Sequence, residues 1–159
     1  MFSAELDLLA TGAVAREGFE QLRTGIAAGS SIPSSLMRKL HRELNLTELT
    51  ICYGMTETSP VSAMTTTDDP LEKRVDSVGK LLPHVRAKVV DPSDKKRVVP
   101  VGERGELAVG GYLVMKGYWG DDEKTREVMV EDEEGTVWMH VSLHHEVTYN
   151  SNLRVLLDR

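Results

Sequence analysis

The sequence has a single cysteine, Cys52, and few aromatic residues, which make up 5% of its 159 positions. One thiol excludes an internal disulfide framework and a zinc site built from several thiolates. Chains without disulfides are typical of reducing, intracellular compartments, and nothing in the composition separates the cytoplasm from mitochondria or peroxisomes. We therefore expect an intracellular protein.

The sequence also lacks a long hydrophobic run. The longest apolar stretch, 107–115, is interrupted by Gly110 and Gly111 and is far shorter than the roughly 20 residues of a membrane-spanning helix. Near the N-terminus, Glu5 and Asp7 interrupt the stretch that would have to form the apolar part of a secretion signal. We expect neither a transmembrane segment nor a signal peptide in these residues.

Positive charge is scarce, because 19 lysine and arginine residues face 25 acidic ones and leave a net charge of −6. Such a chain has no general attraction for nucleic acid or anionic lipid, so we expect neither as a partner. With 40% apolar and 28% charged residues the composition is that of an ordinary globular domain. The sequence gives no indication of an oligomeric state.

The pattern of apolar residues predicts an α/β unit in the first part of the chain. Strands are predicted at 24–27 and 49–52. Between them a helix is predicted to begin at Pro33 and to end near Asn45, with an apolar stripe of Leu36, Met37, Leu40 and Leu44. This order predicts a right-handed crossover between parallel strands, with both following loops at the edge where ligands bind.

From about Pro70 the pattern changes to short strands separated by turns. Val85, Ala87 and Val89 alternate with polar residues, which is typical of a half-buried strand. Further elements are a turn at 91–94, strands at 98–101 and 106–109, a helix from an Asp121 cap through Val128, and a turn at Gly135 into 136–139. We predict an α/β part over 1–70, a β-rich part over 71–140 and a divergent tail over 141–159.

The run Tyr53-Gly54-Met55-Thr56-Glu57 directly follows the second predicted strand. It offers an aromatic ring for a base, a glycine that permits close backbone approach, a hydroxyl for phosphate and a carboxylate for Mg²⁺. The alternative is an ordinary turn in which Thr56 and Glu57 are only solvated. The motif alone leaves both interpretations open.

Four ordered blocks between Leu22 and His140 resemble the acyl-CoA synthetases of the adenylate-forming superfamily. The blocks are 23–30, 52–60, 77–83 and 102–119, the last ending in Gly117-Tyr118-Trp119. The amino-acid sequences of these blocks are most similar to those of medium- or long-chain fatty acyl-CoA synthetases, although Ser31 stands where many members have proline. The resemblance implies a fragment of the large N-terminal domain of such an enzyme, a βαβ segment followed by a β-rich subdomain.

The resemblance also implies roles at an adenylate site. The cofactor-binding residues would be Gly29, Ser30, Tyr53, Gly54 and Thr56. Tyr53 would stack on the adenine of ATP or AMP, Thr56 would hydrogen-bond the α-phosphate, and Glu57 would hold Mg²⁺, which makes Thr56 and Glu57 the catalytic pair. A complete enzyme would activate a fatty acid or another carboxylic acid with ATP and transfer it to CoA.

Three elements of the family have no match in these 159 residues. They are the Ser/Thr/Gly-rich phosphate loop with its lysine, the Thr-Gly-Asp sequence expected after His140, and the C-terminal lysine. Because similarity stops abruptly after His140, we hypothesise a frame or splice change before 141–159. We therefore expect a partial acyl-CoA synthetase that is inactive alone. The alternatives are a non-catalytic interaction or decoy protein and a gene-model fragment.

Two further features favour structural interpretations. Tyr118 and Trp119 could shape a binding surface, but a buried aromatic anchor after Gly117 is the commoner use. His144 and His145 could bind a metal together with the adjacent glutamate, but neighbouring residues of a strand point to opposite faces.

Overall fold

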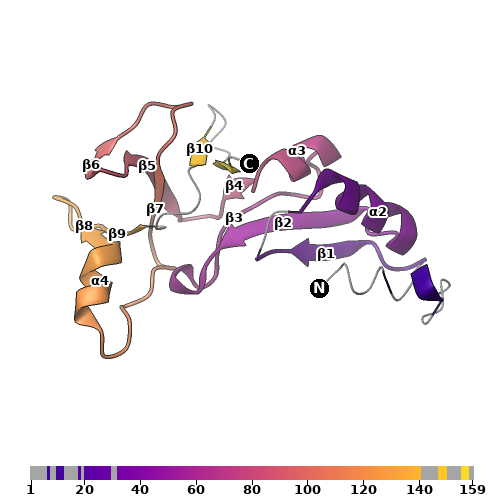
Figure 1. The fold of residues 1–159 in the computed structure, drawn as a ribbon, viewed down its shortest axis with the longest axis horizontal. Coiled ribbons are helices and arrows are strands. Elements are labelled where there is room, and N and C mark those ends of the chain that lie inside the picture. Colours follow the sequence, from indigo (N-terminus) through magenta and orange to yellow (C-terminus); the bar gives the residue numbers. More distant parts are fainter. Residues whose placement is uncertain are drawn as a thin grey trace.

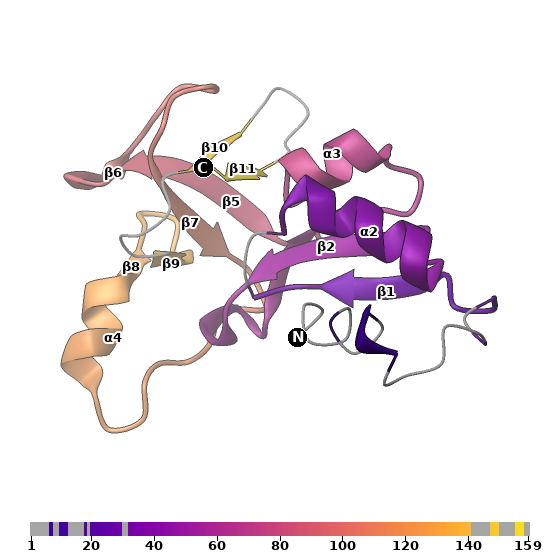
Figure 2. The same cartoon turned by 45° about the vertical axis from the view of Figure 1, so that its right-hand side comes forward.

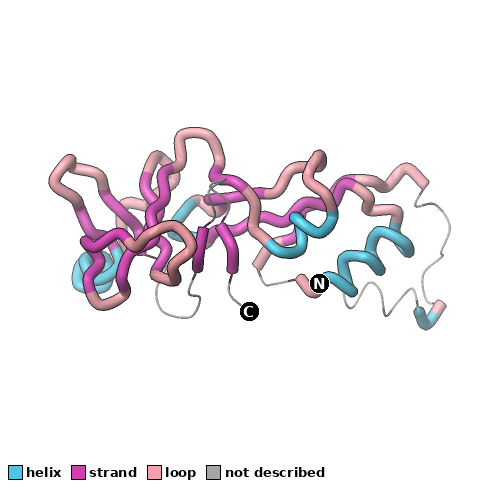
Figure 3. The backbone as a smooth tube through the Cα atoms, turned by 90° about the horizontal axis from the view of Figure 1, so that it is seen from above, coloured by secondary structure: helices cyan, strands magenta, loops and turns pink. Residues whose placement is uncertain are grey.

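The computed structural model describes residues 7, 10–12, 18, 20–29 and 32–140, together with the backbone of 147–149 and 155–157. Two sheets lie next to each other along the long axis of the molecule (Figures 1 and 3). The last two short strands pair with each other in antiparallel fashion; they are β10 (Val147–Tyr149) and β11 (Val155–Leu157). The predicted tail 141–159 lies mostly outside the described residues.

The first sheet is built on a β–α–β unit with parallel strands, as predicted. Its elements are β1 (Thr24–Ala27), α2 (Ser34–Leu44) and β2 (Glu48–Gly54). The two strands are in parallel register, with Ala27 opposite Ile51. The helix begins after Pro33 and ends at Asn45, whose left-handed backbone (φ 54°) stops it.

Helix α2 covers one face of this sheet (Figure 1). Met37, Leu40 and Leu44 of its predicted apolar stripe are buried, with Met37 and Leu40 fully enclosed, and Leu36 is partly buried. The stripe packs with the strands in one cluster made of Ala27, Met37, Leu40, Leu44, Leu46, Leu49 and Ile51. Because burial of each large apolar side chain contributes about 1.5–3 kcal/mol, this contact fixes α2 over the sheet and with it the loops that follow β1 and β2.

After β2 the chain adds four short elements that the sequence pattern did not predict. They are η1 (Thr56–Thr58), β3 (Val61–Met64), α3 (Leu71–Asp76) and β4 (Lys80–Leu81). Strand β3 runs antiparallel to β2 and β4, which gives the order β1-β2-β3-β4. Helix α3 lies beside α2 (Figure 2).

A buried arginine ties α3 to the first sheet. The Arg74 guanidinium donates hydrogen bonds to the backbone oxygens of Asp69 (2.9 Å), Thr47 (3.1 Å) and Leu49 (2.8 Å). Its side chain is almost entirely buried. Since these carbonyl groups lie at the start of β2 and before α3, one side chain satisfies the backbone at the junction of both elements.

The second sheet has five antiparallel strands in the order β6-β5-β7-β9-β8. The strands are β5 (Arg86–Asp91), β6 (Asp94–Val98), β7 (Glu106–Gly110), β8 (Met129–Glu131) and β9 (Val137–His140). Helix α4 (Asp122–Val128) precedes β8, and the Asp121 carboxylate caps it by accepting a hydrogen bond from the Lys124 amide at 2.9 Å. The predicted cap and helix are confirmed.

One predicted strand lies in the wrong place. We predicted a strand at 98–101, whereas β6 ends at Val98. The chain reverses over Pro92 and Ser93, and the Asp91 side chain stabilises this turn by accepting from the Ser93 amide and pairing with Arg97. The tight turn starts the return strand earlier than its hydrophobic residues suggest.

The two sheets share one apolar core. Tyr53, Leu81 and Leu82 pack at its edge. Its buried members come from both sheets and the loops between them: Ala63, Val78, Val85, Val89, Val99, Leu107, Val109 and Leu113.

The predicted mixed α/β class is confirmed. In the described ranges no helix is long and apolar enough to cross a bilayer.

The chain leaves the first sheet at the end of β4, at Leu81, and enters the second sheet at the start of β5, at Arg86. The division into parts over 1–70, 71–140 and 141–159 remains a prediction.

Candidate functional site

The motif beginning at Tyr53 forms the connection between β2 and β3. Gly54 ends β2 at a shift in the strand register. A Cβ atom on Gly54 would lie 1.6 Å from the Pro60 carbonyl oxygen, so no other residue fits there without moving the backbone. Only a glycine lets the chain fold back on itself this closely. The close approach predicted for this glycine is therefore made first by the protein's own backbone.

Thr58, which carries no separate signal in the sequence, holds this turn together. Its hydroxyl accepts a hydrogen bond from the Met55 amide at 3.1 Å. The same oxygen lies within donating distance of the carbonyl oxygens of Met55 (3.1 Å) and Pro60 (3.3 Å). The Thr58 side chain is fully buried, while Thr56 is exposed and Glu57 is half-buried. The turn thus presents a hydroxyl and a carboxylate from a fixed backbone.

Glu57 is held from a distant part of the chain. The Tyr118 hydroxyl donates a 2.8 Å hydrogen bond to Glu57 Oε1, and the Met115 amide donates a 2.9 Å bond to the Glu57 carbonyl oxygen. The hydrogen bond to the carboxylate raises the pKa of Tyr118, with burial and the Glu57 charge acting in the same direction. Tyr118 therefore stays protonated at neutral pH and donates a hydrogen bond to Glu57.

Tyr118 is itself fixed by the cap of α4. Its backbone amide donates to Thr125 Oγ1 at 2.9 Å, and that hydroxyl donates to the Asp121 carbonyl oxygen at 2.8 Å. Gly117, with φ 149°, brings the chain close to Thr125. Trp119 is fully exposed, so the expected buried anchor is wrong for this residue. A chain of polar contacts therefore links the start of α4 to the carboxylate.

The other predicted residues lie at the same edge of the first sheet. Ala27 in β1 pairs with Ile51 in β2. Gly29 and Tyr53 each stand two residues after this pair on their own strand, so they lie at the same end of the sheet. Gly29 has a left-handed backbone with φ 87°. Tyr53 is half-buried against the shared core, and burial raises the pKa of its phenol. Ser30 lies outside the described residues.

The donors at the turn fit a magnesium ion carried by a nucleotide. Glu57 supplies one carboxylate, and no hydrogen bond to its Oε2 is found within the described residues. The exposed Thr56 hydroxyl is its neighbour. Mg²⁺ is commonly bound by one or two carboxylates together with water and substrate phosphates. Across the part of the chain that the structure describes, no group of three or more His, Cys, Asp or Glu side chains could hold a metal by itself.

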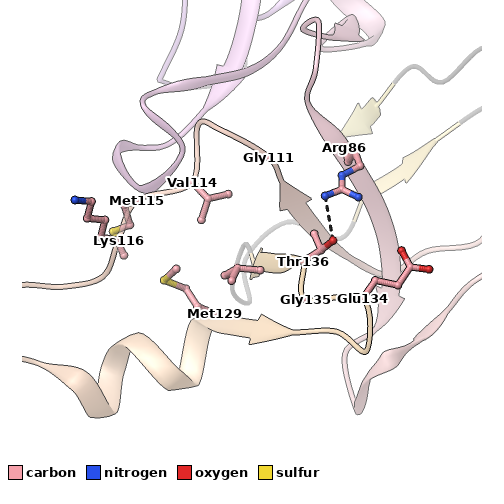
Figure 4. A pocket seen from close by; sticks show the side chains of 10 residues that line it. Arg86, Gly111, Val114, Met115, Lys116, Met129, Glu134, Gly135 and Thr136 are labelled. Carbon is pink, nitrogen blue, oxygen red and sulfur yellow. Dashed lines mark hydrogen bonds between the residues drawn. The ribbon is translucent and has the colours of Figure 1, made fainter.

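A separate cavity of about 700 Å³ opens on the second sheet (Figure 4). Arg86 points into it and donates a 3.0 Å hydrogen bond to the Thr136 hydroxyl. The lining residues are Arg86, Gly111, Val114, Met115, Lys116, Met129, Glu134, Gly135, Thr136 and Val137. None of the predicted site residues that the structure describes lines this cavity, and among these lining residues only Met115 is hydrogen-bonded to Glu57.

Comparison with known proteins assigns the chain to a family. A model described as AMP-binding enzyme matches residues 1–119. The chain belongs to this family. Acyl-CoA ligase SID4 of Ajellomyces capsulatus is 48% identical over 132 residues, which are 83% of this chain and 22% of the relative. Medium-chain acyl-CoA ligase ACSF2, mitochondrial, of Danio rerio is 42% identical over 127 residues, which are 80% of this chain and 21% of the relative.

The fold is also found in a solved structure. The long-chain-fatty-acid-CoA ligase FadD1 from Archaeoglobus fulgidus matches with a TM-score of 0.75 at 21% identity, over 86% of this chain and 28% of that chain. This member of the AMP-binding enzyme family spans about a fifth of the length of its curated relatives. The resemblance to adenylate-forming acyl-CoA synthetases, and the expectation that the chain covers only part of their fold, are confirmed.

Proposed function

We propose that this chain is the nucleotide- and magnesium-contacting part of an ATP-dependent acid–CoA ligase. The observation that carries the proposal is the turn after β2, where a fixed backbone presents the Thr56 hydroxyl and the Glu57 carboxylate in a chain of the AMP-binding family. In the whole protein a carboxylic acid, such as a fatty acid, would attack the α-phosphorus of ATP and release pyrophosphate. The CoA thiol would then displace AMP to give the thioester.

Each residue at the edge of the first sheet has a distinct task in this proposal. Tyr53 offers its ring to the adenine, Gly29 contacts the same base from the loop after β1, and Ser30, which lies outside the described residues, takes the adenine-binding role that the family resemblance implies. The Thr56 hydroxyl donates to an α-phosphate oxygen. Glu57 holds Mg²⁺, which, when bound, neutralises the charge that the phosphates carry during attack. Gly54 keeps the turn tight enough to present these groups.

The proposal is tested by measuring how the 159-residue chain binds ATP with Mn²⁺, a spectroscopically visible substitute for Mg²⁺. The electron paramagnetic resonance signal of free Mn²⁺ decreases as the ion becomes bound, and the size of this decrease reports the affinity. We expect Glu57→Gln to weaken Mn²⁺–ATP binding at least about tenfold, because a metal-binding carboxylate becomes a neutral amide. Glu72→Gln, at an exposed position of α3, is the matched control. Equal affinities in both variants would contradict the proposal.

We expect binding without turnover from this chain. No Ser/Thr/Gly-rich phosphate loop with a lysine occurs in its sequence, so nothing in these residues is expected to cradle the β- and γ-phosphates. Incubation with ATP and a fatty acid should release no pyrophosphate above background. Release that depends on Glu57 would show instead that the chain is a working enzyme, and would remove the non-catalytic alternative.

An intracellular location is part of the same proposal. The only thiol, Cys52, is buried in β2 and free, and burial raises its pKa, so it behaves as a small apolar residue of the core. With a single buried thiol these residues form no disulfide with one another, and such chains are typical of reducing, intracellular compartments.

A further inference from the structure

We propose that Tyr118 is a positioning residue for Glu57: its hydroxyl fixes one carboxylate oxygen so that the other faces the metal-bound phosphates. This inference rests on the proposed function, because Tyr118 can orient a metal ligand only if Glu57 binds the metal of a nucleotide. It adds a residue 61 positions away from the motif to the site.

The geometry of the carboxylate separates the two oxygens. Glu57 Oε1 accepts the 2.8 Å bond from Tyr118, whereas Oε2 has no hydrogen bond from any residue that the structure describes. A free carboxylate rotates about its last side-chain bond, so either oxygen could point outward. A single strong donor on one oxygen removes this freedom. Such partners, which orient a metal ligand without touching the metal, typically change metal affinity 10- to 100-fold.

The donor is as rigidly held as the acceptor. The segment that carries Tyr118 lies beside the turn after β2 (Figures 1 and 2), joined to it by the bond from the Met115 amide to the Glu57 carbonyl oxygen. On its other side, Thr125 accepts from the Tyr118 amide and in turn bonds Asp121 at the cap of α4. The phenol is therefore fixed through its own backbone, independently of the bond that it gives to Glu57.

A purely structural role would not require this hydroxyl. Tyr118 is half-buried, so its oxygen could find water if Glu57 were absent. The net contribution of one such bond to stability is about 1 kcal/mol. Replacing Tyr118 by phenylalanine keeps the ring and its packing, and removes only the donor. The change should therefore be seen in metal-dependent binding rather than in folding.

The experiment compares Tyr118→Phe with Tyr112→Phe in the 159-residue chain. Tyr112 lies in the same connection between β7 and α4, but its side chain is 73% exposed. Two ligands are titrated: ATP with Mn²⁺, and AMP in the presence of a chelator. We expect Tyr118→Phe to weaken Mn²⁺–ATP binding about tenfold while leaving metal-free AMP binding within about twofold of the wild type. Tyr112→Phe should change neither.

A double-variant cycle tests whether Tyr118 acts through Glu57. In a Glu57→Gln background, Tyr118→Phe should have almost no further effect on Mn²⁺–ATP affinity, because the oriented group is already lost. Full additivity of the two substitutions would overturn the inference.

The remaining outcomes separate this inference from the proposed function. If Glu57→Gln lowers Mn²⁺–ATP affinity and Tyr118→Phe does not, the positioning role is wrong and the proposed function stands. If Tyr118→Phe weakens metal-free AMP binding as much as Mn²⁺–ATP binding, the tyrosine acts only on the structure of the turn. If Mn²⁺ adds nothing to nucleotide binding by the wild type, the proposed function fails and the inference fails with it.

Discussion

Replacing Gly54 with alanine should damage the turn after β2 more than any other single methyl group. The added Cβ atom would meet three backbone atoms at once: the Pro60 carbonyl oxygen at 1.6 Å, its carbon at 2.7 Å and the Val61 Cα at 2.9 Å. None of these can rotate away as a side chain would. The strand after the turn has to move, and Thr58 loses the distances at which it holds Met55 and Pro60.

The magnitude follows from the size of this displacement. The Pro60 oxygen must retreat by about 1.4 Å to reach the closest separations that real Cβ atoms show, which is a severe case of overpacking and should cost about 3 kcal/mol. Gly102→Ala is the matched control, because Gly102 has φ 90° and no atom within 4 Å of an added Cβ. It should cost only about 1–2 kcal/mol, from its left-handed backbone. Both substitutions reduce the entropy of the unfolded chain equally, so the difference between their unfolding free energies is the cost of the clash at Gly54 minus the cost of the left-handed backbone at Gly102.

Urea unfolding followed by circular dichroism measures both variants. We expect the Gly54→Ala midpoint to fall well below that of Gly102→Ala, and Mn²⁺–ATP binding to be lost in the former even where it is folded, since Glu57 moves with the turn. If the two variants unfold at the same urea concentration, the close approach of Gly54 to Pro60 does not exist in solution and the reasoning fails.

Three further predictions concern stability. Arg74→Met should cost about 3 kcal/mol in a urea titration, because it strips three backbone carbonyl groups of their donor, and the exposed Lys73→Ala control should cost almost nothing. Burial, aided by nearby lysines, lowers the pKa of His140 from 6.5 to about 4, although the Glu106 carboxylate lies 3.5 Å from its Nδ1, so the stability that the neutral imidazole supports is full above pH 6.5 and falls as the pH drops toward 4; His140→Gln should flatten the pH dependence of stability over this range. Asp121→Ala should remove about 1 kcal/mol of folding stability at the N-terminus of α4 and so lower the melting temperature. An unchanged melting temperature would mean that the Asp121 cap does not stabilise the helix.

The parts of the fold that the sequence predicted are those encoded within a few neighbouring residues. The stripe on α2 repeats at helical spacing, and Asp121 is an N-cap followed by a helix-forming run, so both could be located without knowledge of the rest. The boundaries of β6 could not, although a turn was predicted at 91–94, because the strand that follows it, Asp94–Val98, is mostly charged and exposed and has no apolar pattern. Strand β4 was missed because two residues cannot show a period, and β3, although as long as β1, was missed because its run Val61–Met64 shows no regular alternation of polar and apolar residues.

At the candidate site, the sequence located the motif but not the contacts that shape it. Gly54 was expected to make room for a ligand, and its closest neighbour is Pro60 of the same turn. Thr58 carries no signal beyond being a threonine near a glycine. The partner of Glu57 lies 61 residues along the chain, and no local pattern connects a carboxylate with a phenol at that separation. Long-range contacts of this kind follow from how the two sheets pack together.

The contact between Glu57 and Tyr118 also sets an order of events during folding. The turn after β2 can form as soon as β3 is in place, because all of its own bonds lie within residues 54–61. Its carboxylate reaches its final orientation only when the segment leading to α4 has been synthesised and has closed a loop of 61 residues. A shortened product that ends anywhere between the two would carry the complete Tyr53–Glu57 motif and still lack the finished site.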